Sequence, residues 1–198
     1  MTIPPPPISL VLASTSPYRK AILAKLGLPF EVVAPHVDET SHDRESPEQL
    51  VARLAEAKAK AVAQRFPAAL IIGSDQVAVV DGQVVGKPHT HDKAVAQLKH
   101  ASGKRVAFLS GLCLYNSKSC SSQTDVVPFY VVMRQLSDQQ IQNYLQQEQP
   151  YDCAGSFKSE GLGIALFERL EGTDPNTLIG LPLIRLIRML ENEGVYVI

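Results

Sequence analysis

Blocks of apolar residues recur along the chain at two spacings, one typical of strands and the other of helices. Short apolar runs predict buried strands at 8–13, 30–34, 69–74, 105–115, 124–135 and 161–169. The patterns between them predict helices over 17–26, 47–66, 92–100, 137–147 and 181–191. Shorter runs at 76–80 and 83–85 flank Asp81-Gly82, a strong hairpin signal. The hairpin and the two long neighbouring strands favour an α/β fold with a mixed β-sheet flanked by helices.

The length of the chain, 198 residues of which 45% are hydrophobic, suits one globular domain with a sizeable core. Residues 1–7 contain four consecutive prolines and predict a short stiff tail, so we place a single domain at 8–198. No apolar run approaches the roughly 18 residues that a membrane span needs, and the N-terminus lacks the regions of a signal peptide. We therefore expect a cytoplasmic protein that does not associate with a membrane.

Charge and cysteine content exclude several classes of partner. The formal net charge is −1, from 19 basic and 20 acidic residues, so no overall positive field exists to hold a nucleic acid. A basic cluster would have to be local and would suit a small anion. Cys113, Cys120 and Cys153 form no C-x-x-C pair, so we expect free, buried or inert thiols rather than disulfides or a zinc site.

The segment from Ser14 to Lys20 joins the end of the first predicted strand to the first predicted helix. Unpaired N–H groups at a helix N-terminus, together with the helix dipole, favour a bound anion. Arg19 adds a planar guanidinium that matches the geometry of a phosphate. The alternative is an ordinary Ser-Pro helix cap with solvated basic side chains, and the segment alone does not decide between the two.

A lysine falls on the apolar face of the helix predicted over 47–66. At about 3.6 residues per turn, Val51, Leu54 and Val62 share one face, and Lys58 lies near its middle. A charge turned towards the core is unfavourable unless an opposite charge meets it. A triphosphate, or a carboxylate that also holds a metal, would meet this charge. The alternative is that the side chain extends to the surface, which we favour less for a position in the middle of the face.

Asp75 directly follows the apolar strand predicted over 69–74. Ligand sites in α/β sheets favour the ends of strands, so we expect Asp75 to leave the sheet and enter a loop. A carboxylate there can accept a proton from water or bind a divalent ion. The alternative, an Asp that only forms a turn, is weakened because the turn signal comes later, at Asp81-Gly82.

Three further segments place charged residues in predicted loops. Asp38-Glu39 supplies carboxylates, Gly86-Lys87-Pro88 supplies a lysine, and the segment from Gly155 to Gly161 carries both signs of charge. Each segment alone fits a solvated turn. Together they provide the basic and acidic groups that phosphoryl chemistry with a metal requires.

Five short motifs, in this order along the chain, resemble those of the Maf family. They are Leu12-Ala13-Ser14-Thr15-Ser16-Pro17, Val37-Asp38-Glu39, Ala57-Lys58-Ala59, Gly73-Ser74-Asp75-Gln76 and Gly86-Lys87-Pro88. The resemblance covers essentially the whole chain after the proline tail. It implies an elongated fold related to the inosine triphosphate pyrophosphatases, with a central cleft between two lobes, and it suggests a homodimer.

The resemblance also implies roles for particular residues. Asp75 would accept the proton of the attacking water, and Glu39 and Asp75 would hold a divalent cation, Mg²⁺ or Mn²⁺. The residues implied to bind the substrate are Ser14, Arg19, Lys58, Gln76 and Lys87.

Two positions depart from the common family pattern and resemble the branch that hydrolyses 7-methyl-GTP. Tyr18 stands where the first of two arginines is usual, and Glu160 stands where the branch that cleaves dTTP and UTP has glutamine. N7-methylation gives guanine a positive charge, which an aromatic face attracts. A carboxylate can accept hydrogen bonds from the guanine N1–H and 2-amino groups. We therefore assign Tyr18 and Glu160 to recognition of the base.

The expected activity is the hydrolysis of 7-methyl-GTP to 7-methyl-GMP and diphosphate. One alternative is a dTTP/UTP pyrophosphatase of the same family. Another is a nucleotide-binding regulator of cell division, which would bind a nucleotide without releasing diphosphate. The charged residues argue against such a regulator, because a protein that only binds has no need of Asp75.

Overall fold

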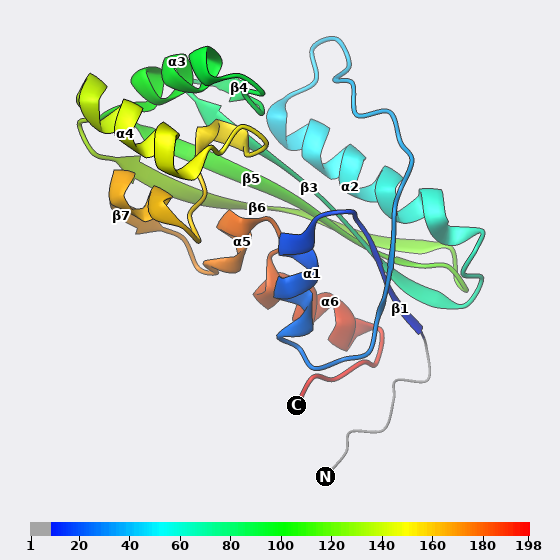
Figure 1. Ribbon diagram of the computed structural model, residues 1–198. Coiled ribbons are helices and arrows are strands. Elements are labelled where there is room, and N and C mark those ends of the chain that lie inside the picture. The colour runs from blue at the N-terminus through cyan, green and yellow to red at the C-terminus, as the bar shows by residue number, and fades with distance from the viewer. Residues whose placement is uncertain (1–8) are drawn as a thin grey trace. The chain divides into compact units, whose positions relative to one another are not determined.

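The computed structural model describes residues 9–198, so the tail predicted at 1–7 lies outside the described residues. The strands are β1 (Ser9–Ala13), β2 (Glu31–Val33), β3 (Ala69–Val80), β4 (Gln83–Val85), β5 (Arg105–Asn116), β6 (Ser121–Met133) and β7 (Phe167–Glu171) (Figure 1). The helices are α1 (Pro17–Ala24), α2 (Pro47–Ala63), α3 (His91–Ala101), α4 (Asp138–Glu148), α5 (Asn176–Ile179) and α6 (Leu183–Asn192), with 3₁₀ turns at Ala154–Ser156 and Leu162–Leu166. Within residues 9–198, none of the helices combines the length and apolar character that crossing a bilayer would need.

The chain divides into two compact units. Among the described residues, unit 1 comprises 9–76 together with Ser110–Val127 and Gly180–Ile198, and unit 2 comprises Val77–Leu109 and Pro128–Ile179. The chain passes from one unit to the other four times, and three of these passages lie inside β3, β5 and β6.

The sheet contains both parallel and antiparallel pairs, which confirms the prediction of a mixed sheet. Its strand order is β2-β1-β3-β5-β6-β7, and β4 pairs with β3. In unit 1, β1 is parallel to both β2 and β3, and Ala13 pairs with Gly73. In unit 2, β4 is antiparallel to β3 and β7 is antiparallel to β6. The pairing of Ala13 with Gly73 brings the end of β1, where Ser14 follows, to the same level as Ser74 and Asp75.

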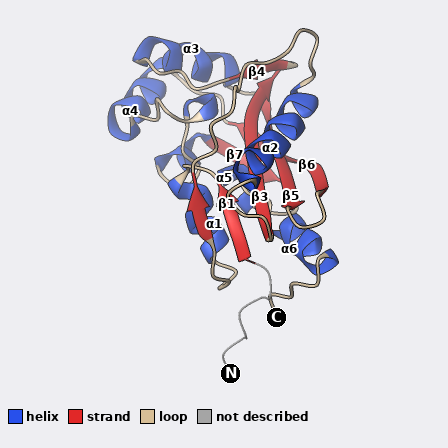
Figure 2. Ribbon diagram, turned by 90° about the vertical axis from the view of Figure 1, so that its right-hand side faces the viewer, coloured by secondary structure: helices blue, strands red, loops and turns tan. Residues whose placement is uncertain are grey.

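In unit 1, the long helix α2 lies directly against the sheet (Figure 2). A Cβ atom at Gly73 of β3 would come within 2.0 Å of the Ala55 carbonyl oxygen, and one at Gly111 of β5 would come equally close to that of Val51. Only glycine fits at these two points, so the helix backbone approaches both strands without intervening side chains. The apolar helix face is confirmed, since its buried residues are Leu50, Val51, Leu54, Ala55, Lys58, Ala59 and Val62.

The core of unit 2 contains three aromatic rings packed edge to face. The ring centroids are 5.2 Å apart between Phe108 and Phe157 and 4.8 Å apart between Phe157 and Phe167. These rings pack in one cluster with Ile141, Tyr144 and Leu145 of α4. Such pairs add about 0.5–1.5 kcal/mol beyond the burial of their area. Phe157 therefore anchors the loop on which Glu160 lies three residues later.

Two predicted strands differ from the structure. The strand at 69–74 continues to Val80, so Asp75 lies inside β3 and not in a following loop. A buried carboxylate need not end a strand when a lysine meets its charge, as Lys58 does here. The strand predicted at 161–169 is instead a 3₁₀ turn followed by β7. The backbone folds back at Gly163, where a Cβ atom would lie 2.2 Å from the Lys158 carbonyl oxygen.

The three cysteines are free thiols, but their surroundings differ. Cys113 is buried in β5, and burial raises its pKa to about 11. Cys153 is partly buried, and burial also raises its pKa. Cys120 is exposed, because it lies in the turn between β5 and β6 with a φ of 57°.

Candidate active site

The ammonium group of Lys58 lies between two carboxylates in unit 1. Its Nζ is 2.6 Å from Oδ1 of Asp75 and 2.7 Å from Oε1 of Glu39. The side chains of Lys58 and Asp75 are only 8% and 11% exposed, whereas that of Glu39 is 61% exposed. The structure thus brings together three residues singled out in the sequence, and the buried lysine meets opposite charge as its place on the apolar face of α2 required.

Arg19 is held in place by a carbonyl oxygen far away in the sequence. Ser16 caps α1, and its hydroxyl accepts a hydrogen bond from the Arg19 backbone N–H at 3.3 Å. The Arg19 side chain donates from Nε to the Gly180 carbonyl oxygen at 2.9 Å. The Ser74 hydroxyl donates to the same oxygen, also at 2.9 Å. Because Gly180 accepts both bonds, it fixes Arg19 in relation to the residue that precedes Asp75.

The charges of this cluster act on one another. Burial lowers the pKa of Arg19 from its ordinary value, while the negative charges of Asp75 and Glu39 oppose that effect. Arg19 therefore shares an electrostatic environment with the two carboxylates that contact Lys58. Two cationic and two anionic side chains converge in unit 1, which is the charge pattern expected for binding a polyphosphate with a divalent ion.

The other predicted residues of unit 1 lie on the same elements. Ser14 is buried at the end of β1, and its hydroxyl accepts a hydrogen bond from the Ser16 N–H at 3.1 Å. Gln76 follows Asp75 in β3 and donates from its amide to the Ser110 hydroxyl at 2.8 Å. Tyr18 is the second residue of α1 and is 39% exposed, so its ring can contact a ligand.

The fit of a divalent cation can be judged from the available ligands. Glu39 and Asp75 direct carboxylate oxygens at a single cationic atom, so their position already favours positive charge. Mg²⁺ is commonly held by one or two carboxylates, with phosphate oxygens and water completing its shell. Among residues 9–198 there is no cluster of three or more His, Cys, Asp or Glu side chains suited to a metal. The two carboxylates fit a metal that arrives with the nucleotide better than a metal held by protein alone.

Two of the predicted residues, Lys87 and Glu160, belong to unit 2, and both are exposed. The loop that carries Lys87 is tied to the loop that leads to Glu160. The Gly86 carbonyl oxygen accepts hydrogen bonds from the Gly155 N–H at 3.4 Å and from the Gln97 side chain at 3.1 Å. Within unit 2, these bonds hold the two loops next to each other.

The pKa of the Cys153 thiol is raised, and charged groups of both loops contribute to its value. Burial is the main cause of the raised pKa of this thiol; Lys158 lowers it, Glu160 raises it and Lys87 lowers it. Lys158 is itself held by Glu148, with Nζ 3.4 Å from the carboxylate oxygen. Unit 2 thus presents a mixed-charge surface on two loops whose positions its core fixes.

Sequence reasoning missed several residues that support this cluster. Ser74 and Ser110 hydrogen-bond to groups of the site, and Gly180 contributes a backbone oxygen. Ser74 lies inside one of the five motifs, so a signal for it was present. Gly180 acts through its carbonyl group, and no side-chain pattern could have marked it.

Comparisons with known proteins agree with the motifs. A family model described as "Maf-like protein" matches residues 9–193. The chain is 60% identical over 195 residues to a 7-methyl-GTP pyrophosphatase of Nitrosococcus oceani, with 98% of each chain covered. It is 58% identical over 190 residues to a 7-methyl-GTP pyrophosphatase of Colwellia psychrerythraea, with 96% of this chain and 95% of that one covered. A solved structure of a HAM1 protein from Coxiella burnetii is 15% identical, with a TM-score of 0.48 over 65% of this chain and 74% of that one.

The family match covers nearly all of the described residues and includes every one of the five motifs. The two relatives are similar over almost their full lengths, so no large part of either chain lacks a counterpart. On these grounds the chain belongs to the Maf family.

Proposed function

We propose that this protein hydrolyses 7-methyl-GTP to 7-methyl-GMP and diphosphate. The observation that carries the proposal is the contact of the Lys58 ammonium group with the carboxylates of Asp75 and Glu39, at 2.6 and 2.7 Å. This contact joins a potential proton acceptor, metal ligands and a phosphate-binding cation in one place. The names of the two close relatives support the choice of nucleotide.

In the proposed reaction, Asp75 accepts a proton from a water molecule as its oxygen attacks the α-phosphorus. A new P–O bond forms there, and the bond from the α-phosphorus to the oxygen that bridges the α and β phosphates breaks. Diphosphate leaves with that bridging oxygen. A divalent cation held by Glu39 and Asp75 would neutralise charge on the phosphates.

The cationic residues have separate tasks in this scheme. Lys58 contacts Asp75 and Glu39, and a bound triphosphate offers its ammonium group further oxygen acceptors. Arg19 is held through its Nε by the Gly180 carbonyl oxygen, and its planar guanidinium matches the geometry of a phosphate. Fixed cations of this kind stabilise developing negative charge without reorganising during the reaction. The family resemblance implies that Lys87 also binds the phosphates.

The base would be recognised by Tyr18 and Glu160. The Tyr18 ring is 39% exposed and could stack on the positively charged methylated guanine. Glu160 is an exposed carboxylate that could accept hydrogen bonds from the edge of the base. Both groups favour a cationic base over a neutral pyrimidine.

The decisive variant for catalysis is Asp75→Asn, which keeps the shape of the side chain but removes the proton acceptor. We expect kcat for 7-methyl-GTP with Mg²⁺ or Mn²⁺ to fall at least about 100-fold, the usual contribution of a general base. Asp138→Asn is a matched control, because this exposed carboxylate forms a surface ion pair with Lys99 in unit 2. Turnover of Asp75→Asn close to that of the unaltered protein would remove Asp75 from its role.

A nucleotide panel tests the choice of substrate. Initial rates with 7-methyl-GTP, GTP, dTTP and UTP, each with and without Mg²⁺, should give the highest kcat/KM for 7-methyl-GTP. A preference for dTTP and UTP would show that Tyr18 and Glu160 have been misassigned. Binding of nucleotide without release of diphosphate would instead favour a regulatory protein.

A further inference from the structure

Glu39 lies in a stretch of chain that has no regular structure of its own. Residues 34–46, between β2 and α2, form neither helix nor strand. No ladder of backbone hydrogen bonds therefore fixes where the Glu39 carboxylate lies. Its 2.7 Å contact with Lys58 has to depend on side chains that hold this loop.

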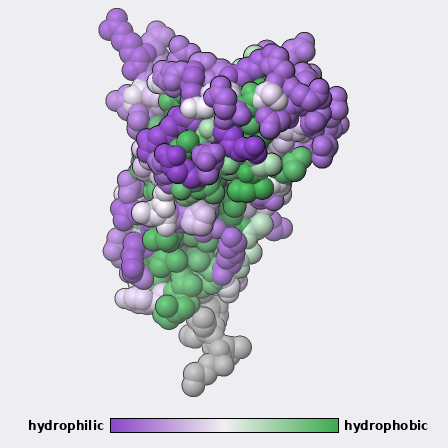
Figure 3. All heavy atoms as spheres, turned by 90° about the vertical axis from the view of Figure 1, so that its left-hand side faces the viewer, coloured by the Kyte–Doolittle hydropathy of each residue, from purple (hydrophilic) through white to green (hydrophobic). Residues whose placement is uncertain are grey.

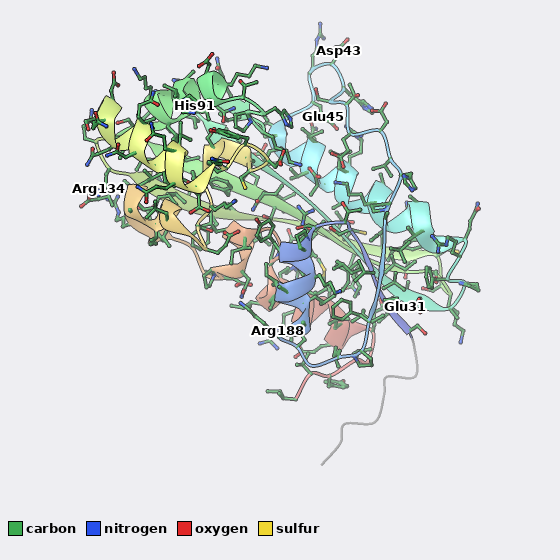
Figure 4. The ribbon with its side chains drawn as sticks, in the orientation of Figure 1. Glu31, Asp43, Glu45, His91, Arg134 and Arg188 are labelled. Carbon is green, nitrogen blue, oxygen red and sulfur yellow. The ribbon has the colours of Figure 1, made fainter. Side chains whose placement is uncertain are left out.

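Arg53 of α2 holds the loop at two points. Its Nε and Nη2 donate to the two carboxylate oxygens of Glu45, at 2.6 and 2.8 Å. Nη2 also donates to the carbonyl oxygen of Thr40, the residue after Glu39, at 3.0 Å. Paired hydrogen bonds between arginine and a carboxylate are among the strongest and most directional in proteins. Figure 4 shows Glu45 beside the first turn of α2.

Side chains within the loop reinforce this arrangement. The Asp38 carboxylate accepts a hydrogen bond from the Thr40 N–H at 2.9 Å, and the Glu45 carboxylate accepts one from the His42 N–H at 3.0 Å. The hydrogen bonds of Arg53 lower the pKa of Glu45 to about 2, so Glu45 is charged at neutral pH. The residues on both sides of Glu39 are thus restrained.

We propose that Arg53 and Glu45 form a latch that positions Glu39 for metal and nucleotide binding. The latch comprises the Arg53 guanidinium, the Glu45 carboxylate and the Thr40 carbonyl group. It gives α2 two tasks, because the same helix presents Lys58 to the Glu39 carboxylate and Arg53 to the loop that carries it. Arg53 is a positioning residue here, and the inference rests on the proposed metal-binding role of Glu39.

The first experiment compares Arg53→Ala, Arg53→Lys and Glu45→Gln in the full-length protein. We expect the Mn²⁺ concentration that gives half-maximal activity to rise about 10- to 100-fold in Arg53→Ala, the usual effect of losing a partner that orients a metal ligand. kcat at saturating Mn²⁺ should fall much less. Arg53→Lys should recover part of the loss, because it keeps the charge but not the paired geometry.

Lys60→Ala is the matched control, since it breaks an ion pair with Glu56 on the same helix that does not involve the loop. Its metal dependence should match that of the unaltered protein. A similar rise in Lys60→Ala would show that the effect comes from weakening α2 and would overturn the latch.

A double-mutant cycle asks whether Arg53 acts through Glu39. In a Glu39→Gln background, Arg53→Ala should change the metal dependence little further, because the group that it positions is already gone. If Arg53→Ala raised the half-maximal Mn²⁺ concentration by the same factor with and without Glu39→Gln, the proposal would be overturned. Thermal unfolding of each variant shows whether a loss of fold contributes.

Amide hydrogen exchange tests the latch without reference to activity. Exchange at Thr40 and His42 should be faster in Arg53→Ala than in the unaltered protein, because both amides bond to groups in the loop. Unchanged exchange would overturn the latch. If the unaltered protein hydrolysed no 7-methyl-GTP, the proposed function would fail, while this measurement would still decide whether Arg53 holds the loop.

Discussion

At the scale of single residues, recognition of the base is assigned to exposed side chains, while the proposed proton acceptor is buried. Glu160 is exposed in unit 2, next to Ser159, whose hydroxyl donates to its carboxylate at 3.2 Å. Asp75 is buried in unit 1 and contacts Lys58. Exposed residues can change with little effect on folding, so a change at Glu160 should alter selectivity without altering stability.

Glu160→Gln tests this separation. A hydrogen bond to a charged group contributes about 1.5–3 kcal/mol, so we expect kcat/KM for 7-methyl-GTP to fall about 10- to 100-fold while that for dTTP stays the same or rises. Glu168→Gln, another exposed carboxylate of unit 2, is the control and should leave both values unchanged. Equal losses with both nucleotides would argue against a role for Glu160 in reading the base.

Lys58 shows what can be predicted about the site from sequence and what cannot. Helical periodicity correctly placed this lysine on the buried face of α2, because burial of a helix face follows a fixed repeat. Its contact with Glu39 could be expected only from the family motifs. Glu39 lies in a loop, and a loop has no hydrophobic periodicity from which the position of a side chain could be predicted. The Arg19 side chain donates to the carbonyl oxygen of Gly180, a backbone atom 161 residues away. Neither helical periodicity nor the family motifs indicated this contact.

At the scale of elements, the spacing between α2 and β3 sets the contact of Lys58 with Asp75. Gly73 allows the helix backbone to touch the strand two residues before Asp75. In Gly73→Ala, the added methyl group would meet the Ala55 carbonyl group, which cannot turn aside as a flexible side chain could. The helix would have to move away from β3. This movement would lower the stability of the fold and would disturb the contact of Lys58 with Asp75.

We therefore expect Gly73→Ala to lose about 1–3 kcal/mol of unfolding free energy, as overpacked interiors do, and to lose most of its activity as well. Gly27→Ala is the control. Its φ of 67° disfavours alanine by about 1 kcal/mol, but no atom lies within 4 Å of the new methyl group. Urea unfolding and initial rates should show a stability loss without loss of activity in Gly27→Ala and a loss of both in Gly73→Ala.

The ion pair between Glu45, in the loop before α2, and Arg53 should make the stability of the fold depend on pH in the acidic range. Arg53 lowers the pKa of Glu45 from its ordinary 4.5 to about 2, so the folded protein binds fewer protons at this group than the unfolded chain. The ion pair therefore stabilises the fold fully above about pH 4.5, and its contribution is lost as the pH falls towards 2.

Urea unfolding at a series of pH values measures this effect. The difference in stability between the unaltered protein and Glu45→Gln should stay constant from pH 7 to 5 and then shrink as the pH is lowered further. A difference that does not change over this range would contradict the assignment of the low pKa to Glu45.

Element boundaries were the weakest part of the sequence prediction. Most strands and all the longer helices lie where apolar patterns placed them, because those patterns reflect burial on one face. β3 was predicted to end at Asp75 because a charged residue usually leaves the sheet, and only the buried lysine beside it explains why the strand continues. The turn at Leu162–Leu166 depends on the close backbone approach at Gly163, which apolar spacing does not encode.

At the scale of the whole molecule, each unit carries a different part of the proposed machinery. Unit 1 holds Asp75, Glu39, Lys58 and Arg19, and unit 2 holds Lys87 and Glu160. On the face of unit 2 that carries α3 and α4, hydrophilic residues predominate (Figure 3). A cleft between two lobes and a homodimer both remain predictions from the family resemblance.

Ligand binding should stabilise the molecule against heat. An α,β-methylene analogue of 7-methyl-GTP, present with Mg²⁺ at about 100 times its Kd, should add about 2.7 kcal/mol of stability. For a chain of this size the corresponding rise in Tm is about 5–10 °C. 7-Methylguanosine, which lacks phosphates, should raise Tm much less, because it offers Arg19 and Lys58 no anion. Equal shifts from both compounds, at matched concentrations, would contradict a polyphosphate site.

The carbonyl oxygen of Gly180, shared by Arg19 and Ser74, has a consequence for biosynthesis. A chain emerging from the ribosome exposes β1, α1 and β3 early, and these elements can begin to pair as they appear. The acceptor that orients the arginine is made only when the last helix is about to be translated. Nascent chains that stop before residue 180 should therefore lack the group that orients Arg19, and we expect them to cleave a nucleotide poorly.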